Sequence, residues 1–164
     1  MPTEAPREGQ AAPHFSVLAD DGSTIALDHF QGRNLLLYFY PKANTSGCTH
    51  EAVEFRDRMM DFQALKTSIV GVSGDTVDEQ TKFKQRYSLN FPLLADTEFA
   101  VIEAYDARRM KSFFGKSFLG IVRTTFWIGP DGKIRKIWPR VNVKGHADEA
   151  LAAIRDSQAE HATA

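Results

Sequence analysis

The chain contains one cysteine, Cys48, at a point where an apolar run over residues 35–40 gives way to a loop and then to a helical pattern. This position puts the sulfur in the first turn of a helix, at the edge of a sheet. Free backbone N–H groups and the positive end of the helix dipole favour a thiolate there. A cysteine that served only as a small core residue would gain nothing from this placement. Cys48 is therefore the leading candidate for nucleophilic chemistry.

Three residues just before Cys48 could assist it. Thr45 lies near the helix cap, where its hydroxyl could bond the helix N–H groups or a molecule beside the sulfur. Gly47 could serve a tight helix entry or the close approach of an anion to the backbone. Pro41 could shape the loop or merely end the strand. Each residue alone has an ordinary structural explanation, so the specific signal is their combined spacing.

The spacing of Pro41, Thr45 and Cys48 resembles the active-site signature of the peroxiredoxins, which are thiol peroxidases on a thioredoxin fold. The surrounding residues are similar to one branch, the bacterioferritin comigratory protein or Q type. That likeness runs from about residue 9 to residue 154 and is strongest in four segments: residues 9–15, 39–51, 91–96 and 120–134. The chain departs from the branch at Ser46, where Pro is usual, at Ala43, where Asp is frequent, and at Gly129, where Asp is common.

The resemblance assigns roles to several residues. Cys48 is the nucleophile that attacks the peroxide, Pro41 belongs to the catalytic loop, and the substrate is bound by Thr45, Gly47, Arg123 and the backbone of Cys48. Taken alone, Arg123 would be a surface arginine at the start of a strand. Its guanidinium suits the implied role because it stays charged and offers several donors in a rigid fork.

Glu51 shares a helix face with Cys48, and a carboxylate there would by itself disfavour the thiolate. The resemblance implies that Glu51 pairs with Arg123 and orients it; the alternative is an acid that complements the helix dipole. His50 is set aside as a base, because residues two apart on a helix point in different directions. The other histidines are too scattered to suggest a metal site, and we expect no metal and no cofactor.

The implied reaction converts the Cys48 thiolate to a sulfenic acid as the peroxide O–O bond breaks. Ionisation alone contributes little to its rate. Full ionisation of an ordinary thiol raises the reactive fraction ~30-fold near neutral pH, but the accompanying loss of nucleophilicity costs ~13-fold. The main catalytic contribution must come from donors that hold the peroxide in line and stabilise charge on its oxygens.

A count of one cysteine excludes intrachain disulfide scaffolds, iron–sulfur centres, dithiol redox pairs and multi-thiolate zinc sites. The two positions where the branch carries a resolving cysteine hold Val53 and Lys84. We therefore expect a one-cysteine enzyme that reduces hydrogen peroxide and organic hydroperoxides in antioxidant defence. Its sulfenic acid would be reduced by an external thiol, either thioredoxin or glutathione with glutaredoxin.

Twenty basic residues balance 21 acidic ones in the 164-residue chain, so no global positive field favours nucleic acid or an anionic membrane surface. Residues 1–13 are polar and rich in Pro, unlike a signal peptide, and no apolar run is long enough for a membrane helix. We expect a cytoplasmic protein that is a monomer or weak homodimer. Residues 108–118 mix basic and aromatic side chains, and we expect a loop near the active site that folds its Phe residues inward or against a partner.

Hydrophobic patterns and turn signals predict the elements that must position these residues. The predicted strands cover residues 15–18, 24–27, 35–40, 69–73, 91–94, 124–128 and 133–138, and the predicted helices cover residues 47–65, 78–87, 98–105 and 145–155. This order favours an α/β thioredoxin-like fold with a mixed central sheet, helices on both faces and an N-terminal β-hairpin. We expect a single domain over residues 1–164, with a flexible arm at about 1–8 and a tail at about 158–164.

Two other functions stay open on the residues alone. A thioredoxin-fold holdase or redox-sensing adaptor could use oxidation of Cys48 to switch a protein contact, although such a sensor does not need transition-state donors. A cysteine hydrolase ranks last, because no recognisable string supplies its His and its Asn or Asp partner.

Overall fold

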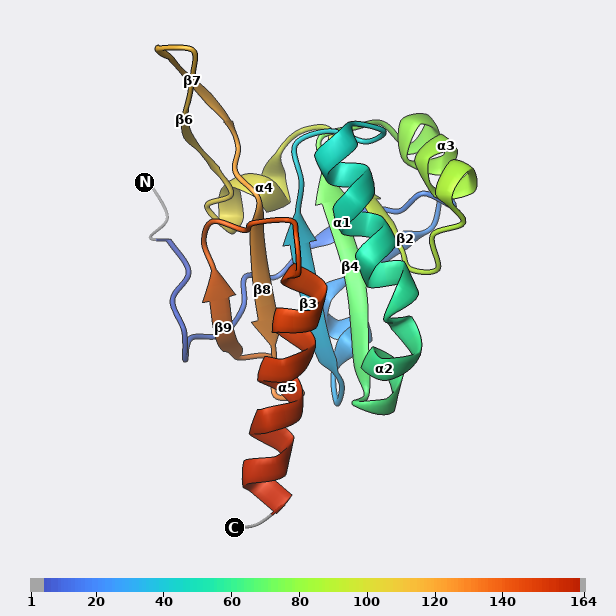
Figure 1. Cartoon of the computed structure of the whole chain (residues 1–164), viewed down its shortest axis with the longest axis vertical. Coiled ribbons are helices and arrows are strands. Elements are labelled where there is room, and N and C mark those ends of the chain that lie inside the picture. Colours follow the sequence, from blue (N-terminus) through green and yellow to red (C-terminus); the bar gives the residue numbers. More distant parts are fainter. Residues whose placement is uncertain (1–4, 163–164) are drawn as a thin grey trace.

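The computed structural model describes residues 5–162 and the side chains of residues 5–158. A five-stranded sheet with the order β5-β4-β3-β8-β9 forms the centre of the molecule (Figure 1). Its strands are β3 (Asn34–Phe39), β4 (Thr67–Ser73), β5 (Leu93–Ala95), β8 (Thr124–Ile128) and β9 (Ile134–Trp138). β3 pairs in parallel with β4 and antiparallel with β8, so the sheet is mixed.

Both faces of the sheet are covered. The helices are α1 (Ser46–Asp57), α2 (Met59–Ala64), α3 (Val77–Tyr87), α4 (Ala100–Ala104) and α5 (His146–Ala162), with a 3-10 turn, η1 (Leu27–Phe30). One core cluster joins Tyr38 of β3 to Phe55 of α1 and Leu151 of α5, and the other joins Phe39 to Ile102 of α4. Figure 1 shows α1, α2 and α5 on one side of the sheet and α4 on the other. The expected thioredoxin-like fold is confirmed.

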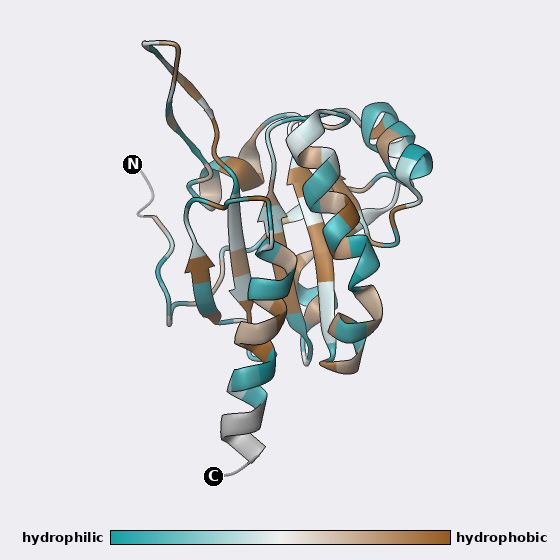
Figure 2. Cartoon of the chain, in the orientation of Figure 1, coloured by the Kyte–Doolittle hydropathy of each residue, from teal (hydrophilic) through white to brown (hydrophobic). Residues whose placement is uncertain are grey.

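β3 is the middle strand of the sheet and lies in the core of the molecule. All six of its residues are buried, as expected for a strand between two neighbours with helices on both faces. Figure 2 shows hydrophobic residues along the central strands and hydrophilic residues over much of α3. The N-terminal hairpin is confirmed as β1 (Ser16–Leu18) and β2 (Thr24–Ala26), which pair antiparallel beside the second core cluster.

The helix expected over residues 47–65 is two helices. α1 ends at Asp57, and Arg58 interrupts the helix with φ −104° and ψ 7° before α2 begins. Arg58 bonds Asp148 of α5 at 2.7 Å, while Phe55 and Phe62 on either side of the break are both fully buried. The sequence has no Gly or Pro at this break. We therefore attribute the break to tertiary packing on both sides of Arg58.

The expected loop over residues 108–118 was wrong: the chain forms a second hairpin that projects from the molecule (Figure 1). Its strands are β6 (Arg108–Phe113) and β7 (Lys116–Ile121), joined by Phe114 and Gly115, both with positive φ. Such a turn matches the twist of a hairpin. Its aromatic side chains do not fold inward, since Phe113 and Phe114 are 65% and 90% exposed.

The remaining expected elements are present with shifted ends. α5 extends to Ala162, beyond the expected end of the last helix, and its side chains are described to residue 158. Residues 1–4 and 163–164, which belong to the expected arm and tail, lie outside the described residues, so the single-domain division with these ends stays a prediction. Within the described residues, no helix is long and apolar enough to cross a membrane.

Candidate active site

Cys48 lies in the first turn of α1, directly after the loop that follows β3. The amide of Thr49 donates to the carbonyl of Thr45 at 2.8 Å, which closes the first turn of the helix around Cys48. The cysteine is free and only 1% exposed. This is the placement that the sequence predicts, at the helix end where backbone N–H groups favour a thiolate.

Arg123 links Cys48 to Glu51. Its Nη2 atom donates to Sγ of Cys48 at 3.2 Å, and its Nη1 atom donates to Oε1 of Glu51 at 3.1 Å. The sheet register explains this contact, because Phe39 at the end of β3 pairs with Thr124 at the start of β8. The loop after β3 therefore meets the residue before β8. One guanidinium thus holds both the sulfur and the carboxylate, as the resemblance implies.

Glu51 is as buried as Cys48, with 1% exposure, and its Oε2 atom has no hydrogen-bond partner. Burial raises the pKa of Glu51 to about 7, against the opposing effect of the positive charge on Arg123. Near neutral pH the carboxyl group therefore exchanges a proton, and the net charge around the sulfur changes with it.

The position of the Arg123 side chain leaves no room for a side chain at Gly47. A Cβ atom added at Gly47 would lie 2.7 Å from Nη2 of Arg123, closer than real contacts allow. The absent side chain leaves room for the guanidinium to reach Sγ of Cys48. The sequence allowed a tight helix entry or the close approach of an anion for this glycine; the group that the structure places against it is instead the chain's own cation, Arg123.

Thr45 and Pro41 lie at the rim of this arrangement. Thr45 occupies the N-cap position of α1, but its side chain makes no capping bond; its hydroxyl instead donates to the carbonyl of Lys42 at 2.7 Å. Pro41 lines a pocket beside Arg123. The plain capping role for Thr45 is therefore not what the structure shows.

Sequence reasoning missed the tether of the catalytic loop. Oδ2 of Asp75 accepts from the backbone N–H of Ala43 at 2.8 Å and from the hydroxyl of Ser73 at 2.6 Å. Gln80 donates to Ser73 and accepts from the hydroxyl of Tyr40, which extends the buried network to the end of β3. Asp75 itself does not cap α3, whose N-cap residue is Thr76. Its position directly after a strand adjacent to β3 was the signal available.

The positions without a resolving cysteine have other partners. Lys84 forms an ion pair with Asp20 at 3.1 Å, and Val53 lines a cavity with Thr49 and Tyr87. His50, set aside as a base, pairs with Glu54 one turn further along α1. Among the described residues, no group of His, Cys, Asp and Glu side chains is arranged to hold a metal ion.

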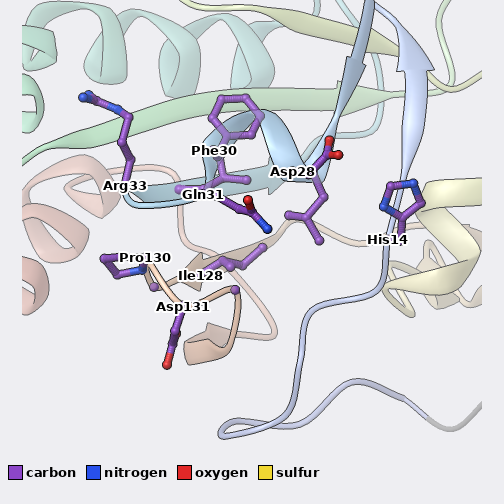
Figure 3. Close-up of a pocket in the computed structure, with 12 residues that line it drawn as sticks. His14, Asp28, Phe30, Gln31, Arg33, Ile128, Pro130 and Asp131 are labelled. Atoms are coloured by element: carbon purple, nitrogen blue, oxygen red, sulfur yellow. The ribbon is translucent and has the colours of Figure 1, made fainter.

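A separate cavity of about 360 Å³ lies at the opposite end of the sheet, where β3 begins and β8 ends. Figure 3 shows its lining, which includes Phe30 and Arg33 before β3 and Pro130 in the turn after β8. The lone cysteine is not among its lining residues, so the site of thiol chemistry is the one around Cys48.

Comparison with known proteins shows the family of the chain. Residues 8–137 match the AhpC/TSA family. Peroxiredoxin Bcp of Bacillus subtilis is 43% identical over 148 residues, covering 90% of this chain and 94% of the relative. Peroxiredoxin Bcp of Escherichia coli is 37% identical over 150 residues, covering 92% and 96%.

Solved structures give the same result. Peroxiredoxin Q of Xanthomonas campestris superposes with a TM-score of 0.83 at 36% identity, covering 87% of this chain and 90% of that one. A PrxQ variant from Xylella fastidiosa superposes with a TM-score of 0.90 at 29% identity, covering 95% and 99%. The chain belongs to the AhpC/TSA family and, within it, to the Bcp or Q-type peroxiredoxins, which are thiol-dependent peroxidases.

Proposed function

We propose that the protein reduces hydrogen peroxide and organic hydroperoxides in antioxidant defence, through a sulfenic acid on Cys48. The observation that carries this proposal is the guanidinium of Arg123, with Nη2 3.2 Å from Sγ and Nη1 on Glu51. A positive group in this position stabilises the thiolate and then the negative charge that develops on the peroxide oxygens. A solved relative supports the substrate class, because the Xanthomonas campestris bacterioferritin comigratory protein has alkyl peroxide reduction activity.

In the first step, Sγ of Cys48 attacks one oxygen and the O–O bond breaks. The other oxygen leaves as hydroxide or alkoxide and takes up a proton, while the sulfur retains the first oxygen as a sulfenic acid. Arg123 and the backbone N–H of Cys48 donate to the peroxide, with Gly47 leaving the space. The Thr45 hydroxyl already donates to the carbonyl of Lys42, so its oxygen is free to accept a hydrogen bond from the peroxide O–H. Pro41 and Glu51 keep the loop and Arg123 in place.

The second step needs a thiol from outside the chain, because Cys48 is the only cysteine. One thiol displaces the sulfenic oxygen as water and forms a mixed disulfide, and a second thiol releases Cys48. Thioredoxin, or glutathione with glutaredoxin, would supply these thiols. We place the protein in the cytoplasm, where such thiols are kept reduced, as a monomer or weak homodimer.

The test is peroxide consumption with a small dithiol as reductant, on wild type, Cys48→Ser and Thr45→Val. Wild type should turn over many equivalents, Cys48→Ser none, and Thr45→Val about tenfold fewer per second. Ser46→Ala, one residue away on the exposed start of α1, is the matched control and should keep the wild-type rate. Turnover that survives in Cys48→Ser would overturn the proposal. One oxidation of Cys48 without turnover would instead favour the redox sensor.

A further inference from the structure

A pocket of about 300 Å³ opens beside Arg123, between four separate parts of the chain. Its walls are formed by Pro41 after β3, Lys111 of β6, Val122 and Arg123 before β8, and Arg140 and Val141 after β9. Three of its six lining residues are cationic and the other three are apolar; no acidic residue lines it. The peroxide chemistry proposed above uses only one of these cations.

Two of the cations of this pocket, Lys111 and Arg123, are close enough to repel one another. The pKa of Lys111 is lowered by partial burial and by the positive charge of Arg123, while the sulfur of Cys48 acts in the opposite direction. The ammonium group of Lys111 donates to the carbonyl of Ile121 at 2.8 Å, and that neutral partner does not cancel its charge. Among the described residues, Arg140 has no hydrogen bond or ion pair. An anion in the pocket would relieve this repulsion.

The position of the pocket indicates which reactant would bring that anion. Hydrogen peroxide is small and neutral, and the donors at Cys48 suffice for it. The oxidised sulfur, by contrast, must be reached by an external thiol, and the pocket is lined by Arg123, whose guanidinium contacts that sulfur. Cations beside an incoming thiol also favour its thiolate, which is the attacking form.

We propose that Lys111 and Arg140 form an anion subsite that binds the carboxylate of a small thiol and positions its sulfur for attack on oxidised Cys48. This inference rests on the proposed peroxidase function and narrows the reductant to a carboxylate-bearing small molecule. A pocket of this volume is at the small end of ligand sites, and its apolar walls fit the carbon chain between a carboxylate and a thiol.

The reaction balances without another reactant. The thiolate attacks the sulfenic sulfur, an S–S bond forms and the S–O bond breaks, and the oxygen leaves as water after taking up protons. A second molecule of the same thiol attacks the mixed disulfide and releases the Cys48 thiolate. Two thiols are oxidised to one disulfide, and the sulfenic acid is reduced by two electrons.

The experiment separates the two half-reactions. Cys48 is first oxidised with one equivalent of hydrogen peroxide, and the decay of the sulfenic acid is then followed with 3-mercaptopropionate, which is anionic, or 2-mercaptoethanol, which is neutral. The measured quantity is the rate constant for 3-mercaptopropionate divided by that for 2-mercaptoethanol. The intrinsic reactivities of the two thiols are the same for every variant, so a change in this ratio reports on the protein. In Lys111→Met/Arg140→Met the ratio should fall about tenfold, the effect of two partly screened charge contacts.

Two controls keep this result specific. Lys116→Met removes the same charge from the same hairpin, outside the pocket, and should keep the wild-type ratio. Added salt should lower the ratio for wild type and leave the double variant nearly unchanged. Arg140 is exposed, so Arg140→Met alone, with about a threefold fall, provides the test if the double variant does not fold.

Three outcomes would overturn the inference. If the double variant reacts more slowly with both thiols by the same factor, Lys111 and Arg140 have only a structural role. An unchanged ratio, with slower oxidation by a carboxylate-bearing hydroperoxide alone, would assign the subsite to the peroxide. If wild-type Cys48 is not oxidised by peroxide at all, the proposed function fails first, and this result is visible before any thiol is added.

Discussion

Nη2 of Arg123 lies 3.2 Å from Sγ of Cys48, although 75 positions separate the two residues in the chain. The contact depends on the antiparallel pairing of β3 with β8, which sets Phe39 opposite Thr124. Arg123 directly precedes β8, and the loop after β3 leads to the helix that carries Cys48. A rigid sheet holds the cation against the nucleophile, and this relationship leads to four predictions.

Replacement of Arg123 should slow the oxidation of Cys48 by peroxide. Arg123→Met should lower the second-order rate constant with hydrogen peroxide about 100-fold, because a charged donor to the transition state is lost. The rate constant of Arg123→Lys should lie between those of wild type and Arg123→Met, since one ammonium group does not reproduce the fork that reaches both Sγ and Glu51. Stopped-flow measurement of sulfenic acid formation checks this; equal rates for Met and Lys variants would show that charge at this position is irrelevant.

Gly47→Ala should separate activity from stability. Its Cβ would lie 2.7 Å from Nη2 of Arg123, the end of a flexible side chain that can move away. The free energy of unfolding should stay within about 1 kcal/mol of wild type, because Ala suits a helix better than Gly. The peroxide rate constant should fall at least about tenfold, because a displaced guanidinium no longer meets the sulfur. A wild-type rate with normal stability would mean that the approach of Arg123 to Gly47 has no role in catalysis.

Glu51 should make stability depend on pH in a defined direction. Its pKa is about 7 in the folded chain against an ordinary value of 4.5, so between these values the folded state holds a proton that the unfolded state has released. The resulting stabilisation is fully present below about pH 4.5 and is lost as the pH rises through about 7. The size of this contribution is on the order of 3 kcal/mol.

The measurement for Glu51 is urea unfolding of wild type and Glu51→Gln across this pH range. Gln keeps the size and a hydrogen-bond acceptor for Arg123 but does not titrate. The stability of wild type relative to Glu51→Gln should therefore decline as the pH rises from about 5 to about 8. Asp57→Asn, at an exposed position on the same helix with Arg56 as its partner, is the matched control. Parallel pH profiles for wild type and Glu51→Gln would contradict the raised pKa.

Asp75→Ala should affect both the fold and the reaction. It leaves the buried N–H of Ala43 and the hydroxyl of Ser73 without their acceptor, at a cost of about 3 kcal/mol. The loop that carries Pro41 and Thr45 loses its tether, so the peroxide rate constant should fall about tenfold. Thr76→Ala, which removes only the cap of α3, should cost about 1 kcal/mol and leave the rate unchanged. Equal rates in the two variants would show that the tether does not position the loop.

The sequence by itself determined the chemistry that is local to one segment. The change from the buried strand that ends at Phe39 to the helix that carries Cys48 is written in consecutive residues, and so is the hairpin turn at Gly129–Gly132. The presence of a single cysteine, with Val53 and Lys84 at the two positions where the family carries a resolving cysteine, is also a sequence property. These features were predictable because strand, turn and helix-start preferences act over a few neighbouring residues.

Only the tertiary structure decided which distant side chains meet. The family resemblance named Arg123 and Glu51, but their distances to each other and to Cys48 depend on the β3–β8 register. The tether from Asp75 to Ala43 and the joining of Lys111 with Arg140 in one pocket have no local signal. The physical reason is that a sequence pattern specifies which face of an element is apolar, whereas the contacts of polar side chains depend on how the elements pack.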